Sequence, residues 1–501
     1  MNRRSKLGVL PVLLALGMLA AGIGAAHAQA KEKVVTVGQT IDISSLNPYG
    51  DINTITFAMW KHIMEPLILF DFDKKEYYGV LAESWTRQGT DYVFKIRKGV
   101  KFHDGTELTA RDVKFSLDTA MKGIQAVILK NVIKSVDVVD DQTVKVTTPA
   151  PFGNLLARLK HIVIVSQKAY EKYGADITSH PIGTGPFEFV EWKKGSHFVV
   201  ARARNYWGTP AKLDKVIWRP IPEDAARVTA LEAGQIDVAT AIPPHDLARL
   251  DKKDSVRVEK IRALRQLIVG LSPRAEPFRN VQVRKAVNHA VDVDYIIKNV
   301  LDGMAVRAIG PSGPQQLGYD PNLKAYAYNP QKAKELLAQA GYPNGFDVVF
   351  NTSVGRYVKD REFTQVLVDQ LAKVGIRAKL AIEEHSVHWS GVTKGKFGMF
   401  LTGAFNEEDP ELFLALYYET GVTPRIGISD PKFDELLRAM RTSATDAERD
   451  RYLRQINAYV HDDMVPILTL WHPIDLYGVN ERLQWKPNPN EEMYFHRAEL
   501  K

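Results

Sequence analysis

The sequence predicts an α/β protein with more than one domain, and three observations support this prediction. Its 501 residues, 45% hydrophobic and 25% charged, have a globular composition and are too many for one ordinary core. From about residue 280 onward, strand-like and helix-like segments alternate, as they do in α/β layers. Two Gly and two Pro within residues 181–187 indicate a crossover between domains.

The N-terminus predicts a cleavable export signal. Three basic residues lie within residues 3–6, residues 7–24 are apolar, and AHA at 26–28 is a small-x-small cleavage site. Loss of residues 1–28 removes three basic and no acidic side chains, which lowers the net charge from +7 to +4. With 0 Cys, the chain has no disulfide and no cysteine to carry a lipid. We therefore expect a periplasmic protein that is not a lipoprotein, and the mild charge gives no reason to expect a nucleic-acid partner.

The first half of the mature chain is expected to be rich in strands. A short β-branched strand, residues 34–38, opens it, and residues 57–63 are predicted to form a helix. The other expected elements are the strands 92–96, 136–139, 143–147, 187–191, 197–201, 216–219 and 236–239, and the helix 224–233.

The second half is expected to alternate helices with strands. Capping residues followed by proline, such as Asn329 and Asp430, mark helix starts. The expected helices are 281–289, 292 to near 303, 330–340, 363–374, 411–418 and 431–440, and the expected strands are 347–351, 376–382 and 399–401.

Residues 101–117, KFHDGTELTARDVKFSL, place a His beside an Asp, which could signal catalysis. Alternation in residues 100–103 predicts a strand, and Asp104-Gly105 predicts a tight turn. Thr109 with Asp112 matches a capping box before a helix. Because each residue has a structural role, we interpret the stretch as architecture.

Catalytic and metal motifs give little support to other functions. G-x-S-x-G, H-E-x-x-H, the P-loop and G-x-G-x-x-G do not occur, so an exported hydrolase is a remote alternative and we expect neither enzyme activity nor a cofactor. His385 and His388 would share one face of a helix, as metal-binding His often do. The pattern offers no third ligand, so we predict no metal site and expect polar residues on a ligand-facing or solvated loop.

Residues 406–410, NEEDP, concentrate negative charge after a strand. Charge runs are usually solvated, so we expect an exposed loop that leads into the helix 411–418. The alternative is a carboxylate cluster that faces a cationic group.

A series of segments resembles the extracytoplasmic solute-binding proteins of family 5, the peptide, oligopeptide, glutathione and nickel class that serves bacterial ABC importers. The matching segments span nearly the whole mature chain, and residues 173–188 and 216–220 look closest to the glutathione and short-peptide members. They are EPLILFD (65–71), VLAESW (80–85), residues 97–117, IGTGPFEFVEW (182–192), NYW (205–207), LEAGQIDVA (231–239), PFRNVQVRKAVNHAVD (277–292) and NPQKAKELLAQAGYPNGF (329–346).

The resemblance implies a periplasmic-binding-protein type II fold of the three-domain, cluster C type. Two lobes would be joined by a hinge, with an extra mixed α/β domain on the first lobe. Lobe 1 would comprise residues 31–72, 187–279 and 475–501, the extra domain residues 73–186, and lobe 2 residues 280–474. The hinge would include Gly183 and Gly185.

The resemblance also implies a function without covalent chemistry. Such a protein captures a small peptide-like or carboxylate-bearing solute by hinge closure, because the solute binds the closed form better. It then delivers the solute, as a monomer, to an inner-membrane ABC permease with its ATPase subunits. A nickel-type carrier of metal chelates that uses His385 or His388 is the alternative on the same scaffold.

Three ligand contacts are implied by matching residues. Arg356, in VGRYVKD, resembles the Arg that holds a peptide carboxylate in relatives, and a guanidinium fork suits a carboxylate. Trp389 matches an aromatic residue of the pocket wall, and Trp471 lies near another. For both tryptophans an ordinary core position is the alternative.

One position departs from the family pattern. Relatives that bind a peptide α-amine use an Asp shortly before an Asp-Pro pair. Aligned on Asp409-Pro410, that position is Asn406, which cannot complete an ion pair with an amine. Either Glu407, Glu408 or Asp409 supplies the charge, or the solute has no free α-amine there.

Overall fold

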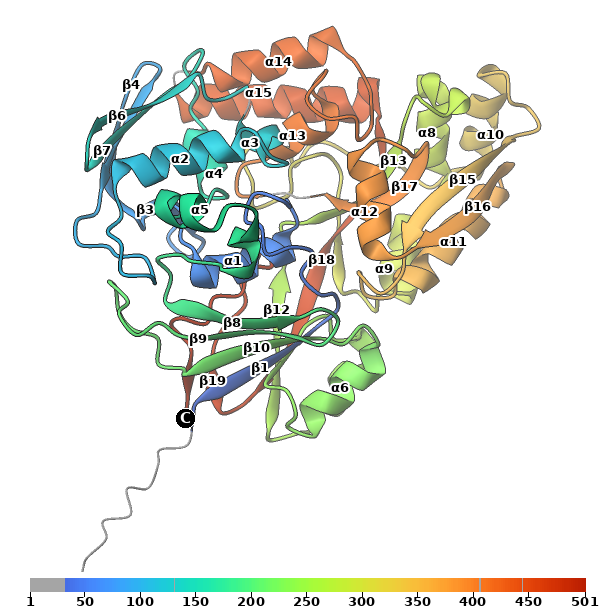
Figure 1. Ribbon diagram of the computed structural model, residues 1–501. Coiled ribbons are helices and arrows are strands. Elements are labelled where there is room, and N and C mark those ends of the chain that lie inside the picture. Colours follow the sequence, from blue (N-terminus) through green and yellow to red (C-terminus); the bar gives the residue numbers. More distant parts are fainter. Residues whose placement is uncertain (1–31, 130, 405–406, 444) are drawn as a thin grey trace, which may run out of the picture. The chain divides into compact units, whose positions relative to one another are not determined.

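One long strand, β18 (Ile467–Asn480), joins the two main sheets of the protein in the computed structural model (Figure 1). Its first half pairs with β13 (Gln266–Leu271) and β14 (Ala305–Arg307), and its second half pairs with β11 (Val238–Ala239) and β12 (Val256–Arg262). The structure describes residues 32–129, 131–404, 407–443 and 445–501. The predicted signal peptide, residues 1–28, lies outside the described residues. No described helix is both long and apolar enough to cross a bilayer.

The first lobe, defined here as residues 33–262 and 474–501, contains the sheet around the second half of β18. The predicted strand near residue 34 is confirmed, and β1 pairs with β10 and β11 in parallel while burying Val35 and Val37. The helix α1 begins three residues before its predicted start because the Asn53 side chain accepts the Ile55 N–H at 3.0 Å. The elements of this part are β1 (Val34–Gln39), α1 (Thr54–Ile63), β8 (Phe187–Lys193), β9 (His197–Arg202), β10 (Lys215–Pro220), α6 (Asp224–Glu232), β11 (Val238–Ala239), α7 (Leu247–Leu250) and β12 (Val256–Arg262).

A separate four-stranded sheet, ordered β4-β5-β7-β6, belongs to the same lobe and carries α2. The predicted capping box of α2 is confirmed, since the Asp112 carboxylate accepts the Thr109 N–H at 2.9 Å. The predicted strand at residues 100–103 is wrong, because the tight turn leaves only one bridge, between Lys101 and Glu107. The elements are β2 (Ile68–Asp71), β3 (Glu76–Gly79), β4 (Ala82–Gln88), β5 (Asp91–Ile96), α2 (Ala110–Ala120), α3 (Ala126–Leu129), β6 (Ser135–Asp140), β7 (Thr143–Thr147), α4 (Leu155–Leu159) and α5 (Gln167–Tyr173).

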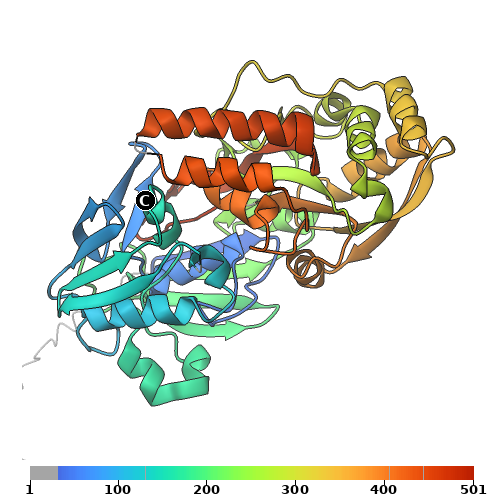
Figure 2. The same ribbon diagram turned by 90° about the horizontal axis from the view of Figure 1, so that it is seen from above.

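The second lobe, residues 266–473, alternates strands and helices as predicted. Figures 1 and 2 both show α14 and α15 packed side by side. β13 is buried on both faces, because Leu267, Val269 and Leu271 enter one hydrophobic core while Ile268 enters another. The elements are α8 (Val281–Ala290), α9 (Val293–Asn299), α10 (Pro330–Gln339), β15 (Phe346–Ser353), α11 (Asp360–Ala372), β16 (Ile376–Glu383), α12 (His385–Thr393), β17 (Met399–Ala404), α13 (Glu411–Tyr418), α14 (Pro431–Arg441) and α15 (Asp446–Tyr459).

The chain crosses between the lobes at two places. Between β12 and β13, Arg262 still pairs within the first sheet, whereas Gln266 already pairs with β17 of the second. On β18, the pairing changes at Pro473–Ile474. Because β13 pairs with β17 and with the first half of β18, residues 266–271 are grouped here with the second lobe, and the expected domain boundary at 279/280 stays a prediction. Residues 33–501 nevertheless make one compact unit.

Candidate functional site

A cavity of about 650 Å³, called here the outer cavity, lies between the two lobes. The first lobe contributes residues of the loop 41–56, the segment 123–127 and Lys194. The second lobe contributes residues of 384–394 and 422–425. Because its walls come from both lobes, a hinge movement would open or close the cavity.

A smaller space of about 40 Å³, the inner pocket, adjoins the outer cavity. Ile52, Asn53, His385 and Trp389 line both spaces, and Arg356 lines the inner pocket. Because they share these walls, the two spaces are called here the cleft, and the polar groups at its inner end suit a small polar solute.

Arg356 lies in the loop between β15 and α11. The Asp360 carboxylate accepts hydrogen bonds from the backbone N–H groups of Gly355, Arg356 and Tyr357 at 3.0–3.1 Å. These bonds fix the loop, so the guanidinium is carried by a well-ordered backbone.

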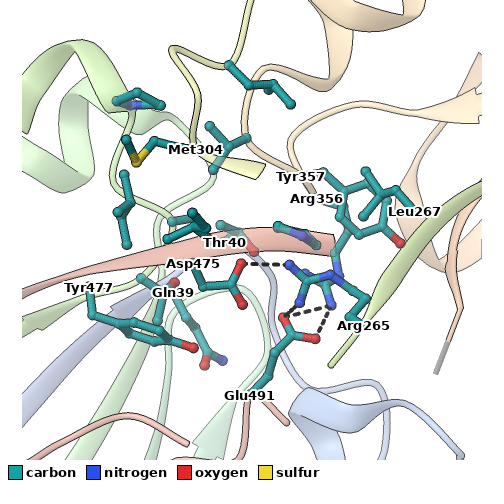
Figure 3. Close-up of a pocket in the computed structure, with 18 of the residues that line it drawn as sticks. Gln39, Thr40, Arg265, Leu267, Met304, Arg356, Tyr357, Asp475, Tyr477 and Glu491 are labelled. Atoms are coloured by element: carbon teal, nitrogen blue, oxygen red, sulfur yellow. Dashed lines mark hydrogen bonds and ion pairs between the residues drawn. The ribbon is translucent and has the colours of Figure 1, made fainter. Parts of the chain in front are cut away.

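Arg356 already has a carboxylate partner from the first lobe (Figure 3). Its Nη2 lies 3.2 Å from both carboxylate oxygens of Glu491. Arg265 contacts Glu491 at 2.5 Å and Asp475 at 2.7 Å. Burial alone would raise the pKa of Glu491, but Arg265 and Arg356 outweigh it and lower this pKa to about 2. We call Arg265, Arg356, Asp475 and Glu491 the inner cluster. Its two positive and two negative charges cancel.

Trp389 lies in α12, beside His385, at the junction of the two spaces. Trp389 is half-buried, as expected for a wall residue rather than for a core tryptophan. Burial and then the charge of Arg356 lower the pKa of His385 to about 3, so its imidazole is neutral at neutral pH. Trp389 therefore lines both spaces, and its contact with a ligand stays a prediction.

The metal-chelate alternative finds no support in the two histidines. His388 is buried, and its Nε2 lies 2.8 Å from the Leu401 carbonyl, away from the cleft that His385 lines. Across residues 32–129, 131–404, 407–443 and 445–501, no group of three or more His, Cys, Asp or Glu side chains could hold a metal ion.

Arg425, which the sequence analysis did not single out, lines the outer cavity from the loop between α13 and α14. Its guanidinium lies over the rings of Trp389 and Tyr417. A lone Arg in a loop belongs to no motif, so the sequence held no signal for it.

The expectation of a solvated acidic loop at residues 406–410 is wrong. Glu407 and Glu408 contact Lys160 at 2.7 and 2.5 Å, and Asp409 contacts Arg449 at 2.5 Å. Both cations come from distant parts of the sequence, so a local pattern could not reveal them. Asp409 lines neither space of the cleft, and a ligand contact for it stays a prediction. Asn406 lies outside the described residues.

Buried ion pairs connect the two lobes. Arg158 in α4 of the first lobe donates two hydrogen bonds of 2.9 Å to Glu411 in α13 of the second. Lys160 of the first lobe likewise forms ion pairs with Glu407 and Glu408 of the second lobe. Because a buried charge is costly without its partner, these pairs favour the arrangement in which the lobes touch.

The remaining predicted site residues lie away from the outer cavity. Trp471 is fully buried with its ring edge-on to Phe363, and it also lines a space of about 60 Å³ beside the inner cluster. Gly183 and Gly185 pack against α1, where a Cβ on Gly183 would lie 2.1 Å from the Ile63 carbonyl oxygen. Their small size serves close packing within the first lobe, and a hinge role for them stays a prediction.

Residues 76–424 match the family model of bacterial extracellular solute-binding proteins, family 5 middle. The glutathione-binding protein GsiB of Pectobacterium atrosepticum is 34% identical over 407 residues, which cover 78% of this chain and 78% of the relative.

Solved structures share the fold. The periplasmic binding protein DppA of Helicobacter pylori, associated with an ABC transporter and in complex with the peptide STSA, superposes with a TM-score of 0.86 and 28% identity, over 93% of this chain and 98% of that one. The binding protein AgaA of A. tumefacien R10, in complex with agropinic acid, gives 0.86 and 24% identity, over 93% and 99%. The predicted type II periplasmic-binding-protein fold is confirmed.

Proposed function

The chain belongs to the bacterial extracellular solute-binding proteins of family 5, the substrate-binding components of ABC importers, and we propose that it captures a small peptide-like or carboxylate-bearing solute. The observation that carries the proposal is the cleft whose walls come from both lobes. The named ligands of relatives support the solute class, since GsiB is named for glutathione and DppA was solved with a peptide. Both ligands carry carboxylates.

Capture would work by closure of the lobes around the solute. A solute shifts the open–closed equilibrium only as far as it binds the closed form better. In this protein the interlobe contacts of Arg158 and Lys160 already favour closure, so the solute adds its own contacts to both walls. The two crossings beside β13 and β18 would absorb the movement.

Arg356 is the proposed group for a solute carboxylate in the inner pocket. A carboxylate there would share or replace the contact with Glu491, so binding exchanges one carboxylate partner for another. Such an exchange keeps the buried guanidinium paired before and after binding, which limits the cost of desolvation.

The closed protein would deliver its solute in the periplasm, as a monomer, to an inner-membrane permease with its ATPase subunits. The family and the relatives are binding proteins, which supports binding without catalysis. The periplasmic description of DppA supports the location.

Calorimetry tests the proposal directly. Purified protein would be titrated with di- and tripeptides, glutathione, opines and sugar acids, and at least one acid should bind with saturation. Arg356→Ala should lower the affinity for that acid about 10- to 100-fold, which is the usual cost of losing a charge-assisted hydrogen-bonded pair. Arg377→Ala, which removes an exposed guanidinium paired with Asp347, should leave the affinity unchanged. Binding of no acid, or full affinity in Arg356→Ala, would contradict the proposal.

A further inference from the structure

We infer that Arg425 is a second anion-binding group of the cleft, so that the preferred solutes carry two acidic groups, one for each guanidinium. The inference rests on the proposed function, because it places the second acidic group of the same solute in the outer cavity. It assigns a role to a residue that no sequence motif marks.

Arg425 is buried without a carboxylate partner. Its side chain is only 2% exposed, and Nη1 has no hydrogen-bond partner among the described residues. No ion pair of the described chain includes it, and burial, which the neighbouring Tyr417 offsets only in part, lowers the pKa of its guanidinium. An unpaired buried charge destabilises a fold, so its presence calls for a partner that arrives from outside.

Other buried arginines of the described chain all have such partners. Their guanidinium groups contact carboxylates or donate to backbone carbonyls, which is the usual condition of a buried Arg. These residues are Arg158 with Glu411, Arg227 with the Thr240 carbonyl, Arg284 with the Met464 carbonyl, Arg356 with Glu491, and Arg449 with Asp409. Arg425 differs from every one of them.

Two aromatic rings hold the Arg425 guanidinium in place. Its central carbon lies 5.1 Å from the ring centre of Trp389 and 4.8 Å from that of Tyr417. Cation–π contacts of this kind use the face of the guanidinium and leave its N–H groups free at the edge. The free edge of a guanidinium is the part that binds a carboxylate in a bidentate way.

The acidic residues of the outer cavity do not neutralise Arg425, because the protein's own donors already occupy them. Asp42 accepts from the Gly195 N–H at 2.7 Å, and Asp51 accepts from the Ile52 N–H at 2.7 Å. Glu384 caps α12 and accepts the Ser386 N–H at 2.9 Å. Lys194 and Lys394, the other cations on the cavity wall, are exposed to solvent. The buried cation with a free donor is thus the distinctive polar group of this space.

The position of Trp389 connects the two guanidinium groups. Trp389 lines both spaces of the cleft, with Arg356 in the inner pocket and Arg425 in the outer cavity. A solute that passes Trp389 can therefore present one acidic group to each Arg.

The test uses glutathione, a diacid, and two derivatives in which either the glycine or the glutamyl carboxylate alone is blocked, together with amidated and free forms of any other peptide that binds. Calorimetry would compare wild type, Arg425→Gln and Arg284→Gln. Arg284 is the matched control, since it is buried and structural but lies outside the cleft. We expect Arg425→Gln to weaken the binding of the free diacid about 10- to 100-fold, and to weaken the binding of one of the two singly blocked derivatives at most about threefold. Arg284→Gln should lower the melting temperature without changing either affinity.

The outcomes separate the two proposals. If the wild type binds no acid, the proposed solute class is wrong and this inference falls with it. If the wild type binds acids but Arg425→Gln weakens the binding of the free diacid and of both singly blocked derivatives equally, or not at all, only the role of Arg425 is wrong. Should Arg425→Gln fail to fold, a crystal structure of the wild type with the bound acid decides. A carboxylate at hydrogen-bond distance from Arg425 is expected, and its absence there would overturn the inference.

Discussion

Arg356 and Arg425 are guanidinium groups of one cleft, and they differ in what surrounds them. Arg356 contacts Glu491 across the lobes, beside the second pair of Arg265 and Asp475. Arg425 has two aromatic rings and no carboxylate among the described residues. The same chemical group is therefore compensated at the inner end of the cleft and left uncompensated at the outer end.

The difference shows how a binding protein can use one charged group for stability and another for ligand binding. A compensated cluster near the crossings contributes to stability and exchanges partners at low cost. An uncompensated buried cation destabilises the empty protein, and a ligand with the opposite charge stabilises the folded state when it binds. Four experiments test this division, in order of decreasing expected effect.

The largest effect concerns pH and the inner cluster. The pKa of Glu491 is lowered from 4.5 to about 2, so its contribution to stability is complete above pH 4.5 and is lost as pH falls toward 2. Urea denaturation should find Glu491→Gln less stable than wild type by about 3 kcal/mol near pH 6. The two proteins should converge near pH 2. A stability difference that stays constant with pH would show that Glu491 acts through packing instead.

The second experiment compares the stability cost of removing each guanidinium. Arg356→Met should destabilise the empty protein by about 2 kcal/mol, because a buried pair loses one partner while Arg265 still holds Glu491. Arg425→Met should change stability by less than about 1 kcal/mol, or increase it, because it removes an unpaired buried charge. Urea denaturation without solute gives both values, and equal losses would remove the distinction between the two sites.

The third experiment removes the internal competitor of the solute. In Glu491→Gln, Arg356 no longer has a carboxylate partner, so an acidic solute should bind about tenfold more tightly, or about 1.4 kcal/mol. The amide of the same solute should bind as it does to wild type. Calorimetry at pH 7 measures both, and a loss of acid affinity would indicate that Glu491 positions Arg356 for the solute.

The smallest effect belongs to the residue between the two sites. Trp389→Leu removes one of the two rings that contact the Arg425 guanidinium. A cation–π contact is worth about 1 kcal/mol, so calorimetry should find the affinity for an acidic solute about fivefold lower. Trp85→Leu, in β4 of the small sheet, serves as a control outside the cleft. Unchanged affinity in Trp389→Leu would mean that the tryptophan only packs.

Much of the fold could be predicted from local signals. The caps at Thr109, Asn329 and Asp430 marked helix starts that the structure has. β13 was missed because a strand buried on both faces shows a continuous apolar run without alternation. β18 was missed because Thr469, His472, Pro473 and Asp475 interrupt its apolar residues.

The candidate site was harder to predict, because its charges come from distant segments. Arg356 and Trp389 were found through family resemblance, and both line the cleft. Neither Glu491 nor Arg425 belongs to a motif, and their importance appears only when the partners of each buried charge are known. The acidic run at 407–409 likewise looked solvated until Lys160 and Arg449 were placed beside it.

The most direct test of carboxylate recognition is native mass spectrometry of freshly purified protein, followed by identification of the released solute. The structure predicts a small peptide or organic acid with at least one carboxylate, bound one to one. A bound solute without any acidic group, such as a neutral sugar, would contradict the central claim that guanidinium groups of this cleft select the cargo.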